Sequence, residues 1–205
     1  MNNVLLKGIT GQLFTSGGGG CAPIVGTTWN SAVGTTNNDY VPFYGLYDYS
    51  QSMTIYRQSD IGSGEKQIKH LKIQLKGFSS GYTVNDQRIK LAHITDSQFG
   101  TSVKSDLTGI AGLADLTECK VQNVTVVNGW MTFTFDTNFC YNGVDNLMIV
   151  WENRDGTWSS GYGWSETHST SSQFLTWYVY QDNTYPASVF GTRSSVGRMN
   201  IKIGY

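Results

Sequence analysis

The chain has 205 residues and a net charge of −1, only 14% of its residues are charged, and aromatic residues make up 13%. The low and balanced charge excludes a basic surface for a nucleic acid backbone and an acidic tail for a basic partner. The length fits one large domain, or one domain with an arm. The polar positions are mostly Ser, Thr, Asn and Gln, which is typical of extracellular or particle-borne β proteins.

The first 28 residues are predicted to form an arm that precedes the folded domain. Val4-Leu5-Leu6 is interrupted by Lys7 and Gly8, so a secretory signal is not expected, and no segment approaches the roughly 18 apolar residues of a membrane span. The glycine run Gly17–Gly20 lacks the lysine of a phosphate loop and predicts a bent joint. The apolar arm residues should pack on the sandwich or on a neighbouring subunit; the assembly candidates are Leu5, Leu6, Ile9, Leu13 and Phe14.

Residues 29–205 predict an antiparallel β-sandwich. The aromatic residues between Tyr40 and Tyr56 are irregularly spaced and predict an extended edge packed across the sandwich. Apolar alternation and β-branched or aromatic runs then predict strands at residues 70–76, 88–91, 131–135, 146–151, 174–180 and 199–203. Residues 146–151 are apolar on both faces, which predicts a central strand.

Turn signals agree with an all-β fold. Asn128-Gly129 predicts the tip of a hairpin with both residues at positive φ, and residues 141–143 predict another tight reversal. Leu107, Ile110 and Leu113 predict at most a short turn of helix, because Gly109 and Gly112 weaken it.

The cysteines and histidines do not predict a metal or cofactor site. Cys21, Cys119 and Cys140 are odd in number and lie outside metal-ligand spacing. We expect three thiols, with a Cys119–Cys140 disulfide as the alternative. Asp145 and its neighbouring asparagines could offer oxygens to Ca²⁺, but they do not form a complete ligand loop. His70 and His93 fall within predicted strands, and His168 pairs with Glu166 in a loop, so the cofactor prediction is none.

Two patterns found in hydrolases have simpler structural explanations, and we predict that the chain is not an enzyme. Residues 77–81 match G-x-S-x-G, but no helical period follows them, so we expect a loop between two strands. Glu152 and Asp155 could be the paired carboxylates of a glycosidase, yet acids in neighbouring loop positions are common. A hydrolase that uses Glu152, Asp155, Glu166 or His168 is the third hypothesis for this chain.

An aromatic, glycine-rich loop is the most suggestive feature for binding. Four of the six tryptophans fall within 27 residues: Trp151, Trp158, Trp164 and Trp177. The loop at residues 153–164 is too polar to be core throughout, so its aromatic residues either fold back as a plug, meet a protein, or stack on sugar rings. The candidate ligand or partner residues are Arg154, Trp158, Tyr162 and Trp164.

Several motifs occur together in a recognisable order. A Tyr- and Ser-rich opening at residues 40–52 is followed by Ile55-Tyr56, then by residues 89–95, and later by F-x-Y-N-G-x-x-N-L at residues 139–147. This order resembles a jelly-roll-like β-sandwich module of Bacteroidetes surface adhesins and of tailed-phage virion structural proteins. The resemblance covers residues 38–150, implies the sandwich fold, and brings no catalytic residues with it.

The expected function is a non-enzymatic structural protein of a tailed-phage virion, in fibre or tail attachment or in capsid decoration. An arm at residues 1–28 would anchor a sandwich at residues 29–205 to other virion proteins or to further copies of the chain. The alternative is a carbohydrate-binding or adhesion module that binds a host-surface glycan through Trp158, Tyr162 and Trp164. The expected location is the virion, or alternatively the bacterial cell surface, with no nucleic acid partner and no membrane insertion.

Overall fold

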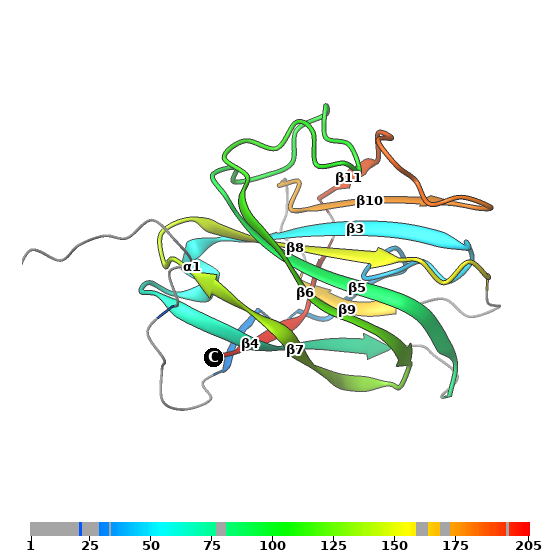
Figure 1. Cartoon of the computed structure of the whole chain (residues 1–205), viewed down its shortest axis with the longest axis horizontal. Helices are drawn as coiled ribbons and strands as arrows, with labels where there is room; N and C mark the ends of the chain where they lie inside the picture. The colour runs from blue at the N-terminus through cyan, green and yellow to red at the C-terminus, as the bar shows by residue number, and fades with distance from the viewer. Residues whose placement is uncertain are drawn as a thin grey trace, which may run out of the picture.

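Two antiparallel β-sheets pack face to face in the computed structural model (Figure 1), which confirms the predicted β-sandwich. The structure describes residue 21 and residues 29–32, 34–76, 81–158, 164–168, 173–195 and 197–205. The predicted arm contacts and the glycine joint lie outside the described residues: Leu5, Leu6, Ile9, Leu13, Phe14 and Gly17–Gly20.

The first sheet has the strand order β1-β13-β4-β9-β12, with β2 paired to β9 and β7 paired to β4. Its strands are β1 (Trp29–Ala32), β2 (Thr36–Asn38), β4 (Lys66–Lys76), β7 (Gly129–Tyr141), β9 (Trp164–His168), β12 (Arg198–Met199) and β13 (Ile201–Gly204). In β4 the predicted alternation is confirmed, because Leu71, Ile73 and Leu75 are buried between the sheets while the residues between them are more exposed.

The second sheet has the order β11-β10-β3-β8-β5-β6. Its strands are β3 (Tyr49–Tyr56), β5 (Thr83–Ile94), β6 (Ala114–Thr125), β8 (Asn146–Asn153), β10 (Thr176–Gln181) and β11 (Thr192–Ser194). The central position of β8 is confirmed. The expected edge at residues 40–56 is wrong for β3, which lies between β10 and β8 and is buried on both faces. The small polar residues of β3 do not indicate a buried strand in the sequence. In the structure Ser52 is nevertheless fully buried, and its hydroxyl donates to the Pro42 carbonyl at 2.7 Å.

The second sheet carries apolar residues on both faces. Its inner face packs on the first sheet with Ile89, Leu91 and Trp151, and its outer face carries a second cluster that includes Met53 and Met148. Phe99 and Val103, from the connection between β5 and β6, close this outer cluster. The double burial explains why residues 147–151 are apolar at successive positions.

The turn at Asn128-Gly129 joins the two sheets, so the hairpin prediction is wrong. β6 pairs with β5, and β7 pairs with β4. Of the two turn residues only Gly129 has a positive φ, at 100°. Val126 is fully buried and its N–H donates to the Tyr82 carbonyl at 2.7 Å, which directs the chain across the core. The reversal predicted at residues 141–143 is confirmed, with Gly143 at a φ of 73°.

Helix is scarce, as expected, and the described part of the chain holds one short helix, α1 (Gln58–Ile61), which the sequence did not predict. The Asp60 carboxylate accepts the Arg57 N–H at 2.8 Å and pairs with the Arg198 guanidinium, so the turn is tied to β12.

The last predicted strand is divided between β12 and β13 at Asn200. The Asn200 side chain accepts from the Gly34 N–H at 2.7 Å and donates to the Gly34 carbonyl at 2.8 Å.

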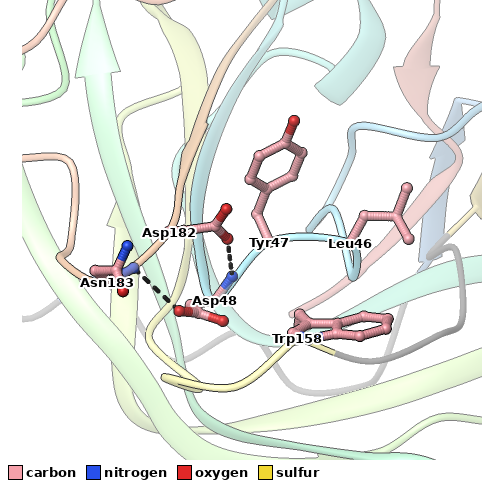
Figure 2. Close-up of a pocket in the computed structure, with 6 residues that line it drawn as sticks. All are labelled: Leu46, Tyr47, Asp48, Trp158, Asp182 and Asn183. Carbon is pink, nitrogen blue, oxygen red and sulfur yellow. Dashed lines mark hydrogen bonds between the residues drawn. The ribbon is translucent and has the colours of Figure 1, made fainter.

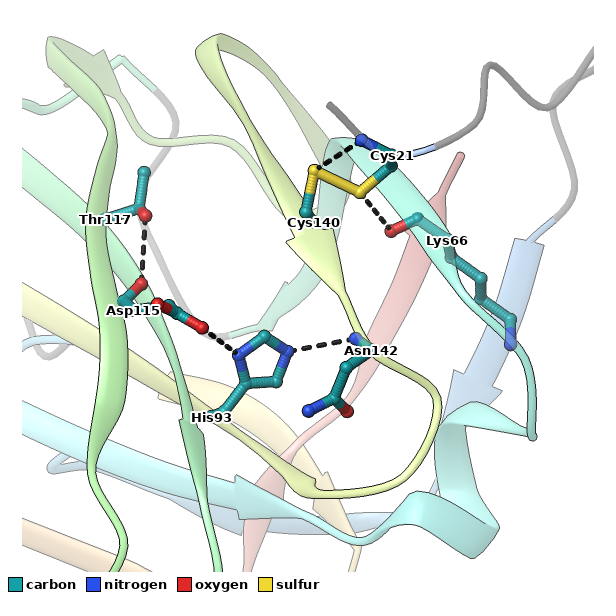
Figure 3. Close-up of a disulfide and its surroundings, with 7 residues drawn as sticks. All are labelled: Cys21, Lys66, His93, Asp115, Thr117, Cys140 and Asn142. Atoms are coloured by element: carbon teal, nitrogen blue, oxygen red, sulfur yellow. Dashed lines mark hydrogen bonds and ion pairs between the residues drawn. A yellow bond between two sulfur atoms is a disulfide. The ribbon is translucent and has the colours of Figure 1, made fainter. Parts of the chain in front are cut away.

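Cys21 and Cys140 form a disulfide with their Cα atoms 5.5 Å apart (Figure 3). This corrects both sequence expectations, since neither three free thiols nor a Cys119–Cys140 pair is present. Cys119 is a free, buried cysteine, and burial raises the pKa of its thiol to about 12. The disulfide ties the residue that follows the predicted glycine joint to β7.

Candidate functional site

An open depression of about 620 Å³ lies at one end of the sandwich, beside Trp158 (Figure 2). Its lining residues are Leu46, Tyr47, Asp48, Trp158, Asp182 and Asn183. They come from three connections: the one that enters β3, the one that leaves β8 and the one that leaves β10. These meet because β3 runs antiparallel to both neighbours, so its first residue lies where β8 and β10 end.

Backbone hydrogen bonds fix the acidic side of the depression. The Asp48 N–H donates to Asp182 Oδ1 at 3.3 Å, and the Asn183 N–H donates to Asp48 Oδ2 at 3.0 Å (Figure 2). The Gly156 N–H donates to the Asp48 carbonyl at 3.0 Å and holds the tryptophan-bearing connection against the same residue. Within the described residues, the second oxygen of each carboxylate accepts no hydrogen bond, so Asp48 Oδ1 and Asp182 Oδ2 are available to a ligand.

Trp158 presents a large apolar surface beside these carboxylates. Its side chain is 62% exposed, which rules out the alternative in which Trp158 folds back as a plug. By contrast, Trp151 and Trp177 are about 1% exposed or less and belong to the two cores. A tryptophan that stays exposed in a formed depression is suited to stacking on a ligand.

The structure separates Arg154 from Trp158. Arg154 lines a second cavity of about 330 Å³ on the outer face of the second sheet. There its Nε donates to Glu152 Oε2 at 2.8 Å, and its guanidinium stacks 4.0 Å from the centre of the Tyr185 ring. Lys90 Nζ lies 2.5 Å from Glu152 Oε1, so both oxygens of this buried carboxylate are paired. The cavity is therefore built around an internal ion-pair network.

The other predicted site residues are only partly described. Tyr162 lies outside the described residues, and Trp164 begins β9 with its side chain outside them. Glu152 and Asp155 have separate partners, because Asp155 Oδ1 accepts the Asn85 N–H at 2.9 Å. Among the residues that the structure describes, no group of three or more His, Cys, Asp or Glu residues could hold a metal ion.

The histidine within β5 has a structural role. The Asn142 N–H donates to His93 Nε2 at 3.0 Å, so this nitrogen is the acceptor and Nδ1 carries the proton toward Asp115, 3.2 Å away (Figure 3). The ring packs against Phe139 with the ring centres 4.8 Å apart. His93 thus links β5 to the turn that follows β7.

A cluster of five tyrosines continues from the depression, and the sequence did not reveal it as a unit. The members are Tyr40, Tyr44, Tyr47, Tyr178 and Tyr180. Tyr47 lines the depression, and the centre of its ring lies 4.3 Å from that of Tyr180. Tyr40 stacks on Tyr178 with nearly parallel rings whose centres are 4.4 Å apart. Burial raises the pKa of Tyr178 to about 12, above the usual value of about 10 for a phenol.

Within the described part of the chain, no helix has the length and apolar character needed to span a membrane. Comparison with known proteins finds no match: no family model, no curated protein and no solved structure is significantly similar to this chain.

Proposed function

We propose that the protein is a non-enzymatic carbohydrate-binding module and that the depression beside Trp158 is its binding site. The observation that carries the proposal is the combination of an indole that is 62% exposed with two carboxylates whose second oxygens lack a partner among the described residues. The apolar face of a sugar ring stacks on an aromatic ring, while its hydroxyls donate to carboxylates. The depression offers both surfaces on connections held by a rigid sandwich.

The open shape of the depression indicates what kind of glycan would fit. A cavity of about 620 Å³ that opens to solvent leaves room for a saccharide unit while the chain continues outside. Backbone hydrogen bonds to both carboxylates hold the connections before any ligand arrives, which lowers the ordering cost of binding.

The proposal predicts that Trp158→Ala abolishes or weakens glycan binding at least about tenfold, because the stacking surface is lost. A glycan array identifies ligands of the wild-type protein, and titration calorimetry then compares the dissociation constants. Phe190→Ala is the matched control, since Phe190 is 63% exposed but lies outside the depression. The proposal fails if no glycan binds the wild type, or if both variants bind as well as the wild type.

A second candidate function is assembly into a tailed-phage virion through the arm, in line with the family resemblance. The observation that favours it is the Cys21–Cys140 disulfide, because a force on residues 1–20 would pass through it directly to β7. Disulfides also persist on virion and cell surfaces, where the environment is oxidising. The two functions are compatible in a protein that forms a receptor-binding tip.

The assembly role predicts that deleting residues 2–20 leaves a folded, glycan-binding sandwich that no longer joins the particle. Circular dichroism checks the fold, and incorporation is measured by mass spectrometry of particles from a complemented deletion strain. Full incorporation of the shortened chain would contradict the anchoring role and would leave the binding proposal intact.

A further inference from the structure

We infer that the depression selects glycans made of neutral or amino sugars and excludes those made of acidic sugars; this inference rests on the proposed carbohydrate binding. Among the described lining residues, the charged ones are Asp48 and Asp182, and both are acidic. An acidic sugar would bring a third carboxylate into a site that already holds two. A neutral sugar supplies hydroxyl donors, and an amino sugar supplies a cation.

The hydrogen-bonding capacity of the lining points in the same direction. An ionised carboxylate only accepts hydrogen bonds. Asp48 and Asp182 each use one oxygen to accept a backbone N–H from the other's connection, so their positions are fixed. The remaining oxygens can receive donors from a ligand, and they repel a ligand acceptor with the same charge.

The basic residue nearest to Trp158 along the chain does not neutralise this acidic lining. Arg154 lies on the same connection as Trp158, but its guanidinium is bonded to Glu152 and stacked on Tyr185 in the second cavity. The sequence that follows Trp158 is Ser-Ser-Gly-Tyr-Gly, which adds no charge. The ion-pair network around Glu152 thus leaves the depression acidic by holding Arg154 elsewhere.

The test compares matched ligands that share one backbone and differ in a single substituent. Oligosaccharides of glucose, galactose and mannose are each offered in neutral, 2-amino and 6-carboxylate forms to the wild-type protein. We expect the carboxylate form of any bound backbone to bind at least about tenfold more weakly than its neutral form, with the amino form binding best at low salt.

The double variant Asp48→Asn/Asp182→Asn keeps the shape of both side chains and removes their charge. It should bring the affinities of the neutral and carboxylate forms to within about threefold of each other, because the like-charge repulsion is gone. Asp136→Asn is the control, since this exposed aspartate pairs with Lys120 on the β6–β7 side of the molecule. Far-ultraviolet circular dichroism verifies that each variant is folded.

The outcomes separate this inference from the proposed function. If acidic glycans bind as tightly as neutral ones and Trp158→Ala abolishes that binding, the charge selection is wrong and the binding function stands. The charge selection is also wrong if the folded double variant retains the wild-type preference. If no glycan binds in a Trp158-dependent way, the proposed function and the inference fail together. Should the double variant not fold, the affinity ratios of the wild type decide the question alone.

Discussion

Replacing Trp151 by alanine is expected to lower the free energy of unfolding by about 4 kcal/mol. Trp151 is fully buried between the sheets, and its ring meets Phe133 edge-on with the ring centres 5.2 Å apart. Its Nε1–H donates to Gln87 Oε1 at 2.9 Å. The truncation therefore opens a large cavity and removes the donor to a side chain that is itself buried.

Urea unfolding followed by circular dichroism measures this change. Trp158→Ala is the control within the same class of substitution and should change stability by less than about 0.5 kcal/mol, because Trp158 is mostly exposed. The loss of unfolding free energy for Trp151→Phe should lie between those for Trp151→Ala and Trp158→Ala, because phenylalanine keeps most of the ring and loses the hydrogen bond. A loss below about 1 kcal/mol for Trp151→Ala would show that this residue does not anchor the packing between the sheets.

The strands that the sequence predicted correctly are those whose burial follows a simple pattern. In β4 one face is buried and the other is polar, so Leu71, Ile73 and Leu75 alternate strictly. In β8 both faces are buried, so apolar residues are continuous. Where burial follows the pleat of a strand, local sequence is sufficient to predict that strand.

The missed strand β6 shows where local sequence is insufficient. Its pairing with β5 shifts register at three places, between Val84 and Gln87, Ile89 and Lys90, and Leu91 and His93. Two of these shifts place an extra residue in β6, and only Cys119 and Val124 of this strand are buried, so no regular apolar alternation marks it in the sequence. The Asn128-Gly129 turn was misassigned for a related reason, because only the long-range pairings of β6 and β7 distinguish a hairpin from a crossing between sheets.

The candidate site was predictable in its aromatic part. Trp158 stood out because a tryptophan in a polar, glycine-rich loop is unusual. Asp48 and Asp182 complete the depression. Each lies more than twenty residues from Trp158 along the chain, and they lie beside Trp158 in the fold because β3, β8 and β10 are neighbours. Proximity in the sequence groups Arg154 with Trp158, whereas the ion pair with Glu152 places the Arg154 side chain in another cavity.

Reducing the Cys21–Cys140 disulfide is expected to lower the free energy of unfolding by about 4 kcal/mol. The two residues are 119 positions apart in sequence, so the cross-link restricts most of the unfolded chain. Its loss increases the conformational entropy of the unfolded state, while the cores between and outside the sheets remain. Urea unfolding with and without a reductant measures the difference.

Cys21→Ser provides the matched control, because this variant should already have the lower stability and should not respond to reductant. Thiol titration of the unfolded chain should find one thiol without reductant, which is Cys119, and three with it. Three thiols without reductant, or a wild-type unfolding midpoint that reductant does not shift, would contradict the disulfide. Burial raises the pKa of the Cys119 thiol to about 12. The folded protein should therefore show almost no thiol reactivity at pH 8, and the appearance of reactive thiol then also measures unfolding.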